Sequence, residues 1–326
     1  MRSSFVPRLG REISLIGQGC WQLGADWHHV GDDTAQGILE AAADAGVTFF
    51  DTADVYGDGR SEKAVGEFLR SWGDEVFVAT KMGRRADPHV AEAYTLDNYR
   101  RWTDRSRENL GVDTLDLVQL HCPPTEVFGD PRTYDDLRTL RDEGRISHFG
   151  VSVETCAEAL DALRDPDVAT VQIILNVFRR KPLEQVVAAA HEAGVGIIAR
   201  VPLASGLLSG KYDEHTEFAA EDHRNWNRDG SKMNIGETFS GVPYEVGVEA
   251  AREVAALTPE GWTTAQMALA WIGAVGAATI IPGASRPDQA RANAAAADMP
   301  SLDDATMAAL AAIYNERIRE HVHARW

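Results

Sequence analysis

Four side chains that can carry charge or exchange a proton stand at, or just after, the ends of short apolar segments. Asp51, Lys81 and His121 each end such a segment, and Tyr56 lies five residues beyond Asp51. Each alone has an ordinary structural explanation, as a helix cap, a solvated strand end, a packed imidazole or a loop aromatic. Because polar side chains that point toward one mouth need one another as partners, the four together predict a chemical site.

The chemistry open to this set follows from the acidity of its groups. A phenol loses its proton at a pH of about 10, so Tyr56 is a poor acid until a cation such as Lys81 stabilises its anion. Asp51 would hold Lys81 charged and in place, and His121 could hydrogen-bond the phenol or a substrate oxygen. The set holds no nucleophile and no cluster of metal ligands, so a second reactant must attack the carbon. A hydride from a nicotinamide cofactor fits that need.

An alternation of β-rich and helical segments would bring these residues together. The β-rich segments are Leu15–Gly19, Val47–Asp51, Val76–Lys81, Leu115–His121, Ile146–Ser152, Val168–Leu175, Val195–Arg200 and Ala278–Pro282. The helical segments between them include Thr34–Ala45 and Ser61–Arg70. We therefore expect an α/β protein, a (β/α)8 TIM barrel in a single domain, residues 1–326. In such a barrel the reactive residues lie at the C-terminal ends of the strands.

Two regions interrupt the alternation. Residues 212–242, from Tyr212 to Val242, are polar and rich in Asp, Glu, Asn and Gly, which predicts a long loop after the seventh strand. A loop of this size in a compact domain is usually a lid over a site or a disordered segment. After Ser301, apolar residues recur at helical spacing and predict an extra C-terminal helix; they are Met307, Leu310, Ala311 and Tyr314.

Composition excludes several classes of partner. The formal net charge of -18 repels phosphate backbones and anionic lipid surfaces, and we find no basic patch that would overcome it, so we expect no nucleic acid and no membrane. Cys20, Cys122 and Cys156 are far apart, and neither they nor His28 and His29 have ligand partners at metal-site spacing. The first ten residues lack the apolar run of a signal peptide. We expect a cytoplasmic protein with a small-molecule substrate and no metal.

Several sequence motifs resemble the aldo-keto reductase family. The segments that surround the four residues are FFDTADVYGDGRSEKAVGEFL, VFVATKMG and LDLVQLHCP. Further matches are GQGCWQLG, GRISHFGVS, VQIILN, PLASGLLSGKY and IIPGASRPDQARAN, so the resemblance covers nearly the whole chain. It implies an NADP(H)-dependent oxidoreductase in which Asp51, Tyr56, Lys81 and His121 form the catalytic tetrad and Tyr56 is the general acid or base.

The resemblance also implies a cofactor bound without a Rossmann fold, and the chain has no GxGxxG motif: the nearest stretch, Gly17 to Gln22, ends in Gln. Ser152 and Gln172 would bind the nicotinamide carboxamide, and Gly19, Cys20 and Trp21 would lie near the ribose. The diphosphate loop would contain Pro202, Leu203, Gly206, Leu208, Gly210 and Lys211, and the adenosine half would meet Gly283, Ser285, Arg286, Gln289 and Asn293. Arg286 is the candidate for the 2′-phosphate, which favours NADP(H) over NAD(H).

Three positions depart from the common family pattern. Val153 stands where many members have an Asn that binds the carboxamide. Arg200 replaces an aromatic residue that stacks on nicotinamide; its planar guanidinium could stack as well, or could face the substrate or the diphosphate. Gly283 stands after Pro282 in place of a basic residue, which weakens the case for NADP.

The substrate pocket is less readable from the sequence. Trp21 and Trp27, in the loop after the first strand, and Met82, beside Lys81, are placed to line it. The resemblance implies aldehydes, ketones, sugars or polyols as substrates. We expect reduction of aldehydes or ketones to alcohols, or the reverse. The alternatives are an aldose or polyol dehydrogenase that works mainly in the oxidative direction, and a catalytically weak cofactor-binding barrel.

Other reaction classes fit less well. Gly150 to Glu154 approaches the GxSxG motif of a hydrolase, but it ends in Glu and follows a barrel strand. A lyase or isomerase would want a carboxylate base or a Schiff-base lysine with a phosphate site. Lys81 is the one serious Schiff-base candidate, and Asp51 beside it would keep it protonated. A channel partner or storage protein on the same fold stays open, because tetrad residues alone do not prove turnover.

Overall fold

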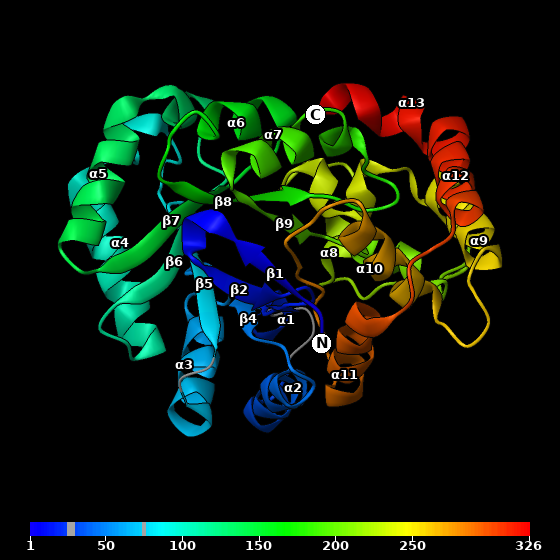
Figure 1. Cartoon of the computed structure of the whole chain (residues 1–326), viewed down its shortest axis with the longest axis horizontal. Coiled ribbons are helices and arrows are strands. Elements are labelled where there is room, and N and C mark those ends of the chain that lie inside the picture. The colour runs from blue at the N-terminus through cyan, green and yellow to red at the C-terminus, as the bar shows by residue number, and fades with distance from the viewer. Residues whose placement is uncertain (25–29, 74–75) are drawn as a thin grey trace.

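Eight parallel strands form a nearly closed barrel in the computed structural model, which describes residues 1–24, 30–73 and 76–326 (Figure 1). The strands are β3 (Gln18–Gly19), β4 (Phe49–Asp51), β5 (Phe77–Met82), β6 (Leu115–His121), β7 (Ile146–Ser152), β8 (Val168–Ile174), β9 (Gly196–Arg200) and β10 (Thr279–Ile280). Each pairs with the next along the chain. Single bridges join Ile16 to Ile280 and Gly19 to Gly283 and so close the ring between β3 and β10. The predicted (β/α)8 barrel is confirmed.

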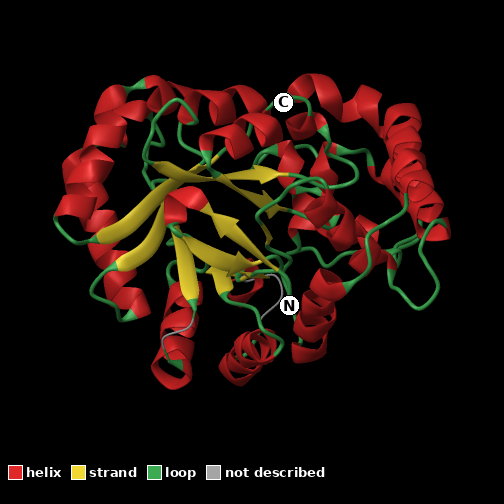
Figure 2. Ribbon diagram, in the orientation of Figure 1, coloured by secondary structure: helices red, strands yellow, loops and turns green. Residues whose placement is uncertain are grey.

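Helices surround the strands (Figure 2). They are α2 (Asp32–Asp44), α3 (Arg60–Trp72), α4 (Leu96–Leu110), α5 (Pro131–Asp142), α6 (Cys156–Ala162), α7 (Val186–Ala193), α9 (Tyr244–Ala256), α10 (Thr264–Ala274) and α11 (Pro287–Ala295). Capping side chains define where several of them begin: Thr95, Asp130 and Thr155 each accept a hydrogen bond from a backbone N–H of the first turn. The long loop and helices α9 and α10 separate β9 from β10, in agreement with the long interval between the last two predicted strands.

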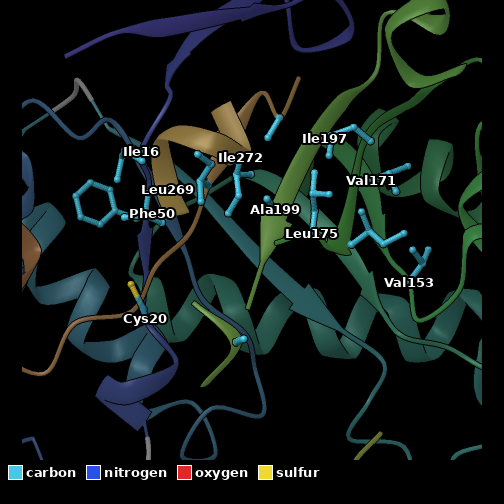
Figure 3. Close-up of a cluster of buried hydrophobic side chains, with 14 of the residues drawn as sticks. Ile16, Cys20, Phe50, Val153, Val171, Leu175, Ile197, Ala199, Leu269 and Ile272 are labelled. Carbon is cyan, nitrogen blue, oxygen red and sulfur yellow. The ribbon is translucent and has the colours of Figure 1, made fainter. Parts of the chain in front are cut away.

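The larger hydrophobic core lies between the strands and the helices. Figure 3 shows part of it, with Leu269 and Ile272 of α10 among side chains such as Ile16, Phe50 and Ile197. Alternation along each strand sends one set of side chains to this outer core and the other set into the barrel. The residues that point into the barrel near the strand C-termini are therefore the ones that can meet a ligand.

An N-terminal hairpin closes the opposite end of the barrel. It consists of β1 (Ser3–Val6), a helical turn over Pro7–Leu9 and β2 (Arg11–Ser14), and it is dark blue in Figure 1. Its apolar side chains pack on residues from the barrel interior; the cluster is Val6, Leu9, Ile13, Phe49, Phe77, Ala79, Leu117, Ala169, Ile198 and Ile281. The sequence did not predict this hairpin, because two strands of four residues give too short an alternation to recognise.

The predicted element boundaries hold with small differences. The first, second and eighth strands are shorter than predicted, as Gln18–Gly19, Phe49–Asp51 and Thr279–Ile280, because their outer residues join neighbours only through single bridges or isolated backbone hydrogen bonds. Helices α2 and α3 match the two predicted helices to within two residues at each end.

The long loop between Tyr212 and Val242 is packed against the rest of the protein. It contains α8 (His223–Trp226) and single helical turns over Ile235–Glu237 and Phe239–Gly241. Asn227 is fully buried, and its amide donates to the Thr238 hydroxyl at 3.1 Å. The structure thus shows a packed segment, and its action as a lid over the site stays a prediction.

The C-terminal part contains the predicted extra helix. Helix α12 (Asp304–Ile313) continues through a π-helical turn, Tyr314–Ile318, into α13 (Arg319–Val322), and the chain ends at the buried side chain of Trp326. No helix among the described residues is both long enough and apolar enough to cross a membrane.

Candidate active site

The four predicted tetrad residues meet at the barrel mouth, the end of the barrel where the strands have their C-termini. Asp51 ends β4, Lys81 lies in β5, His121 ends β6, and Tyr56 lies in the turn after β4. Lys81, only 1% exposed, forms an ion pair with Asp51 and donates to the carbonyl of Thr52 at 2.8 Å. Its ammonium also donates to the phenolic oxygen of Tyr56 at 3.4 Å.

A tight turn aims Tyr56 into the mouth. The Tyr56 N–H donates to the carbonyl of Ala53 at 3.1 Å, and its own carbonyl accepts from the N–H of Ser61 at 3.2 Å. Gly24 and Gly57 face each other closely: a Cβ at Gly24 would lie 2.4 Å from the Tyr56 carbonyl carbon, and one at Gly57 would lie 2.4 Å from the Gly24 oxygen. Any side chain at these two positions would push the turn away, so the glycines allow Tyr56 to approach Lys81.

The charges of the site influence one another. Burial opposes the positive charge of Lys81, but Asp51 and Tyr56 beside it outweigh this effect and raise its pKa. Burial also raises the pKa of Tyr56, and Lys81 works against that rise. The lysine is therefore a permanent cation, and the phenol keeps its proton at neutral pH while standing next to a charge that stabilises its anion.

His121 faces Tyr56 edge-on, with ring centroids 5.9 Å apart and an interplanar angle of 85°. Burial and the charges of Arg84, Lys81 and Arg200 lower the pKa of His121 well below its usual value, so the ring is neutral at neutral pH. Its Nδ1 atom has no hydrogen-bond partner among the described residues. A neutral imidazole in this place can hydrogen-bond a substrate oxygen without carrying charge itself.

Two glutamines lie beside Asp51 inside the barrel. Gln172 donates to the second carboxylate oxygen of Asp51 at 2.8 Å, and Gln119 donates to the same oxygen at 3.3 Å. Gln172 was predicted as a carboxamide partner, whereas Gln119 was not predicted. Gln119 precedes His121 by two residues on β6, so the alternation of a strand places both on the same face, and this signal could have revealed it.

A second group of charged residues lies beside the tetrad, and we call it the mouth network: Arg84, Glu154, Arg200 and Glu237. Arg200 forms ion pairs with Glu237 and with Glu154, the latter at 3.2 Å, and donates to the carbonyl of Val153 at 3.0 Å. Arg84 approaches Glu154 to 3.7 Å without a hydrogen bond. Burial disfavours the Arg200 charge, but Glu237 and Glu154 reverse the effect and raise its pKa.

The sequence had indicated only Arg200 as a site residue from this network. Arg84 follows Lys81 by three residues, and its place next to a catalytic strand end was a signal that could have been used. Glu237 comes from the long loop, and nothing in its local sequence shows that it reaches β9.

The predicted substrate-pocket residues divide three ways. Trp21 lies at the mouth, with its ring centroid 6.4 Å from Tyr56 and 4.8 Å from His223 of the long loop. Met82 is not brought to the mouth, because it alternates with Lys81 along β5 and packs into the outer core instead. Trp27 lies outside the described residues.

Three predicted cofactor stretches converge on the same mouth, at the ends of the neighbouring strands β9, β10 and β3. In the stretch after β9, Val201, Ala204, Ser205 and Gly206 all have positive φ, from 47° to 99°. Such left-handed residues are costly for side chains with a Cβ, and they give the loop tight turns in which the N–H groups of Ala204 and Gly206 donate to the carbonyls of Val201 and Leu203 at 3.1 and 2.9 Å. The role of this loop toward a diphosphate stays a prediction.

The stretch after β10 also fits a polar ligand. The Gln22 amide lies over Gly283, where a Cβ would come within 2.1 Å of it, and the Gln22 Oε1 atom is buried without a hydrogen-bond partner among the described residues. Asn293 donates to the Gly283 carbonyl at 3.2 Å, and Gln289 accepts from the N–H of Ser285 at 2.9 Å. Gln22, which the sequence analysis did not select, thus adds an unused acceptor beside the predicted residues.

The remaining predicted cofactor residues differ in what they can contact. Arg286 is 62% exposed and pairs with Asp288 at 3.2 Å, and Lys211 is exposed, so both can meet a phosphate. Ser152 ends β7, and Pro202 and Leu203 lie in the loop after β9. The side chains of Cys20 and Leu208 are fully buried in the outer core, so only their backbone could touch a cofactor (Figure 3 shows Cys20).

Across the described ranges, no three His, Cys, Asp or Glu side chains gather closely enough to hold a metal ion. The arrangement as a whole offers a proton donor beside a fixed cation and a neutral imidazole. This arrangement can reduce a carbonyl, provided that a hydride donor binds.

Comparison with known proteins agrees with the geometry. Residues 15–315 match the model of the aldo/keto reductase family. The chain is 30% identical over 302 residues to the aldo-keto reductase YhdN of Bacillus subtilis, covering 90% of this chain and 87% of that one. It is 28% identical over 310 residues to the NADP(+) aldo-keto reductase yakc of Schizosaccharomyces pombe, with coverages of 90% and 86%.

A solved structure is similar as well. The glycerol dehydrogenase of Gluconobacter oxydans superposes with a TM-score of 0.79 at 26% identity, covering 98% of this chain and 96% of that one.

One buried carboxyl near the site makes stability depend on pH. Asp54 is fully buried, and neither of its oxygens has a hydrogen-bond partner in the described part of the chain; burial and then Glu62 raise its pKa to about 8. An unfolded aspartate has a pKa of about 4, so the folded state holds an extra proton between these values, and this residue lowers the free energy of unfolding as pH rises from about 4 to about 8.

We therefore expect Asp54→Asn to stabilise the protein at pH 9 by about 1–3 kcal/mol, with the gain shrinking toward pH 5. Urea unfolding at several pH values measures this. Asp58→Asn, an exposed aspartate of the same loop with a 79% exposed side chain, controls for the loss of a charge. A gain for Asp54→Asn that is the same at all pH values would contradict the assignment.

Proposed function

The chain belongs to the aldo/keto reductase family, and we propose that it transfers a hydride between NADP(H) and a small carbonyl compound or alcohol, with Tyr56 as the proton donor and acceptor. The observation that carries the proposal is the buried Lys81 ammonium, which contacts both Asp51 and the oxygen of Tyr56. A cation held in this position makes a phenol a usable acid. Among the described residues of the mouth, no other acidic group is held beside a buried lysine in this way.

Proton transfer is the part of the reaction that this chain performs itself. NADPH, when bound, supplies the hydride to the carbonyl carbon. The carbonyl oxygen, which gains negative charge, takes the proton from Tyr56, and Lys81 stabilises the phenolate that remains. Asp51 keeps Lys81 charged and in place, and neutral His121 donates a hydrogen bond to the same substrate oxygen. In the oxidative direction Tyr56 and Lys81 act in reverse, and the phenolate accepts the alcohol proton.

Residues from four neighbouring strands, β7 to β10, and from the loops after them would hold the cofactor. Ser152 and Gln172 are the partners for the nicotinamide carboxamide, the left-handed loop after β9 is the partner for the diphosphate, and Arg286 is the partner for a 2′-phosphate. The preference for NADP draws support from the NADP(+) enzyme of Schizosaccharomyces pombe among the relatives. Val153 has no side-chain hydrogen bond to give, so the carboxamide would be held by fewer partners than in many members of the family.

Arg200 would form a wall of the nicotinamide site. Both of its terminal nitrogens are engaged, with Glu237 on one side and with Glu154 and the Val153 carbonyl on the other. A guanidinium whose terminal nitrogens are engaged offers its planar face to a neighbour, and Nε is its one donor without a partner among the described residues. This favours stacking on the nicotinamide ring over the alternatives of binding substrate or diphosphate.

Arg84 and Glu154 would bind polar substituents of the substrate. Their nearest charged atoms are 3.7 Å apart and not hydrogen-bonded to each other, and both side chains are partly exposed. A hydrogen-bond donor and an acceptor therefore lie side by side, and both can still bind a ligand. A hydroxyl group can accept from the one and donate to the other. This pairing favours hydroxylated aldehydes and ketones, and the similarity to a glycerol dehydrogenase points the same way.

A second candidate function is an aldose or polyol dehydrogenase that works mainly in the oxidative direction, which the glycerol dehydrogenase relative also supports. Rates with NADPH plus aldehyde and with NADP plus polyol, measured at equal pH, separate the two. Absence of turnover in both directions with NADP and NAD would leave the cofactor-binding protein without strong activity as the remaining alternative.

Tyr56→Phe tests the proton donor. The variant keeps the ring but removes the acid, so kcat should fall by about 100- to 10,000-fold while the affinity for NADPH changes little. Absorbance of NADPH measures turnover, and quenching of protein fluorescence measures cofactor binding. Tyr134→Phe, which removes a buried hydroxyl bonded to the carbonyl of Phe128, is the matched control. Wild-type turnover in Tyr56→Phe would eliminate Tyr56 as the acid.

Arg84→Gln tests the substrate pair. We expect KM for glyceraldehyde to rise about 10-fold and KM for propanal, which lacks hydroxyls, to change less than about 2-fold, since one lost hydrogen bond to a charged group is worth roughly 1.5 kcal/mol. Arg85→Gln is the control, because Arg85 pairs with Asp58 at the adjacent position. Equal changes for the two aldehydes would remove Arg84 from substrate selection.

Arg286→Ala tests the choice between the two cofactors. If Arg286 binds the 2′-phosphate, Kd for NADPH should rise about 10-fold or more and Kd for NADH should stay constant, because NADH lacks that group. Arg291→Ala, an exposed arginine on the same helix, controls for loss of charge. Parallel losses for both cofactors would count against the assignment.

A further inference from the structure

One segment of the long loop lies between the barrel mouth and the C-terminal residues. It comprises Ile235–Glu237, Thr238 and Phe239–Gly241, and we call these residues 235–241 the strap. Its two sides have different partners. One side reaches the mouth network, and the other packs on Trp326 and Arg179.

The mouth side of the strap holds a charge in the site. Glu237 pairs with Arg200, and its backbone carbonyl accepts from the hydroxyl of Ser205 at 3.1 Å. The same hydroxyl oxygen accepts from the N–H of Phe239 at 3.0 Å. The strap is thus joined to the left-handed loop after β9 as well as to Arg200, so a shift of the strap would move both.

The opposite side of the strap rests on an aromatic ring. A Cβ at Gly241, which has a φ of +77°, would lie 2.5 Å from the Trp326 ring. A Cβ at Gly236 would lie 3.2 Å from the same ring and 2.9 Å from the Arg179 guanidinium. The two glycines let the strap backbone lie directly against Trp326, which is itself only 7% exposed.

Arg179 joins Trp326 to the strap. Its guanidinium carbon lies 3.0 Å from the centroid of the Trp326 ring, and Nη1 donates to the carbonyl of Ser240 at 3.5 Å. Arg179 is 2% exposed and forms no ion pair with a carboxylate within the described residues. Burial, and then the charge of Arg200, lower its pKa to about 8. A desolvated cation of this kind depends on the aromatic face that covers it.

The strap needs these contacts to keep its shape. Phe239 and Ser240 have φ values of +51° and +58°, a conformation that residues with a Cβ rarely adopt unless their surroundings impose it. Asn176 holds Ser240 by a 2.8 Å hydrogen bond to its hydroxyl. The strained turn is also held by Ser205 on the mouth side and by Arg179 and Trp326 behind it.

We propose that Trp326 is a positioning residue for the active site: by holding Arg179 and the strap, it keeps Glu237 on Arg200 and so maintains the mouth network. The ring contacts of Trp326 are with Arg179 and the strap glycines, and we assign it no part in proton transfer. The effect on turnover rests on the proposed function, whereas the effect on the strap does not. Each can be measured separately.

The direct test is hydrogen exchange of the strap. In Trp326→Ala, peptides that cover residues 228–242 should exchange at least about 10-fold faster than in the wild type, while peptides from β5 and β6 keep their rates. Trp326→Phe retains an aromatic face and should restore most of the protection. Trp72→Ala, which removes an exposed tryptophan on α3 that stacks on Phe68, controls for the loss of an indole ring away from the strap. Unchanged exchange of the strap in Trp326→Ala overturns the proposal whatever the activity.

The functional test is kinetic. In Trp326→Ala we expect KM for the carbonyl substrate to rise about 10-fold and kcat to change less than about 3-fold, because the tetrad stays intact. In a Glu237→Gln background the same substitution should add less than about 2-fold, since both act through Arg200. If the KM of the double variant rises by the product of the two single effects, Trp326 does not act through Glu237, and this part of the proposal is overturned. If wild-type protein reduces no carbonyl, the proposed function fails, and hydrogen exchange alone decides the role of Trp326.

Discussion

A lysine ammonium buried in a protein must be neutralised where it stands, and the site is built around that requirement. Lys81 is almost completely inaccessible, so without Asp51 its charge would cost several kcal/mol or would be lost by deprotonation. Asp51 is itself buried and has to be satisfied on its other oxygen, which Gln172 and Gln119 do. The remaining direction of the ammonium faces Tyr56. Four strands, β4, β5, β6 and β8, thus contribute to one compensated charge, and their mutual register fixes where the phenol lies.

The mouth network applies the same rule to a second cation. Arg200 is compensated by two carboxylates, one from the end of β7 and one from the loop after β9. The difference is that Glu237 comes from an irregular segment with strained backbone, not from a strand. The tetrad is therefore held by strands of the sheet, whereas the mouth network is held partly by side chains that support a loop. Residues of the mouth network could be replaced during adaptation to a new substrate more easily than the tetrad, because such changes would not disturb the barrel.

Local periodicity in the sequence made the strand-end residues of the tetrad predictable. Apolar runs of five to seven residues end at Asp51, Lys81 and His121, and parallel strands place their C-termini together. Gln119 could also have been predicted from the alternation along its strand. Glu237, Arg179 and Trp326 could not be predicted, because their partners are set by long-range packing that no short sequence pattern encodes. Met82 was misplaced for the opposite reason: adjacency to Lys81 in the chain suggested proximity in space, but a strand turns neighbours to opposite faces.

The N-terminal hairpin has a consequence for how the chain must fold. Its partners are distant in sequence: Arg8 donates to the carbonyls of Ala193, Asp165 and Val168 at 2.8 Å each, and the amino group of Met1 lies 3.2 Å from Asp298. The adjoining strand β3 meets β10 near residue 280. The hairpin therefore obtains its partners only when segments as distant as residues 165–298 are available to it. These closing contacts have high contact order, so we expect closure of the barrel to be late and the apolar side chains of Val6, Leu9 and Ile13 to stay unburied until it happens.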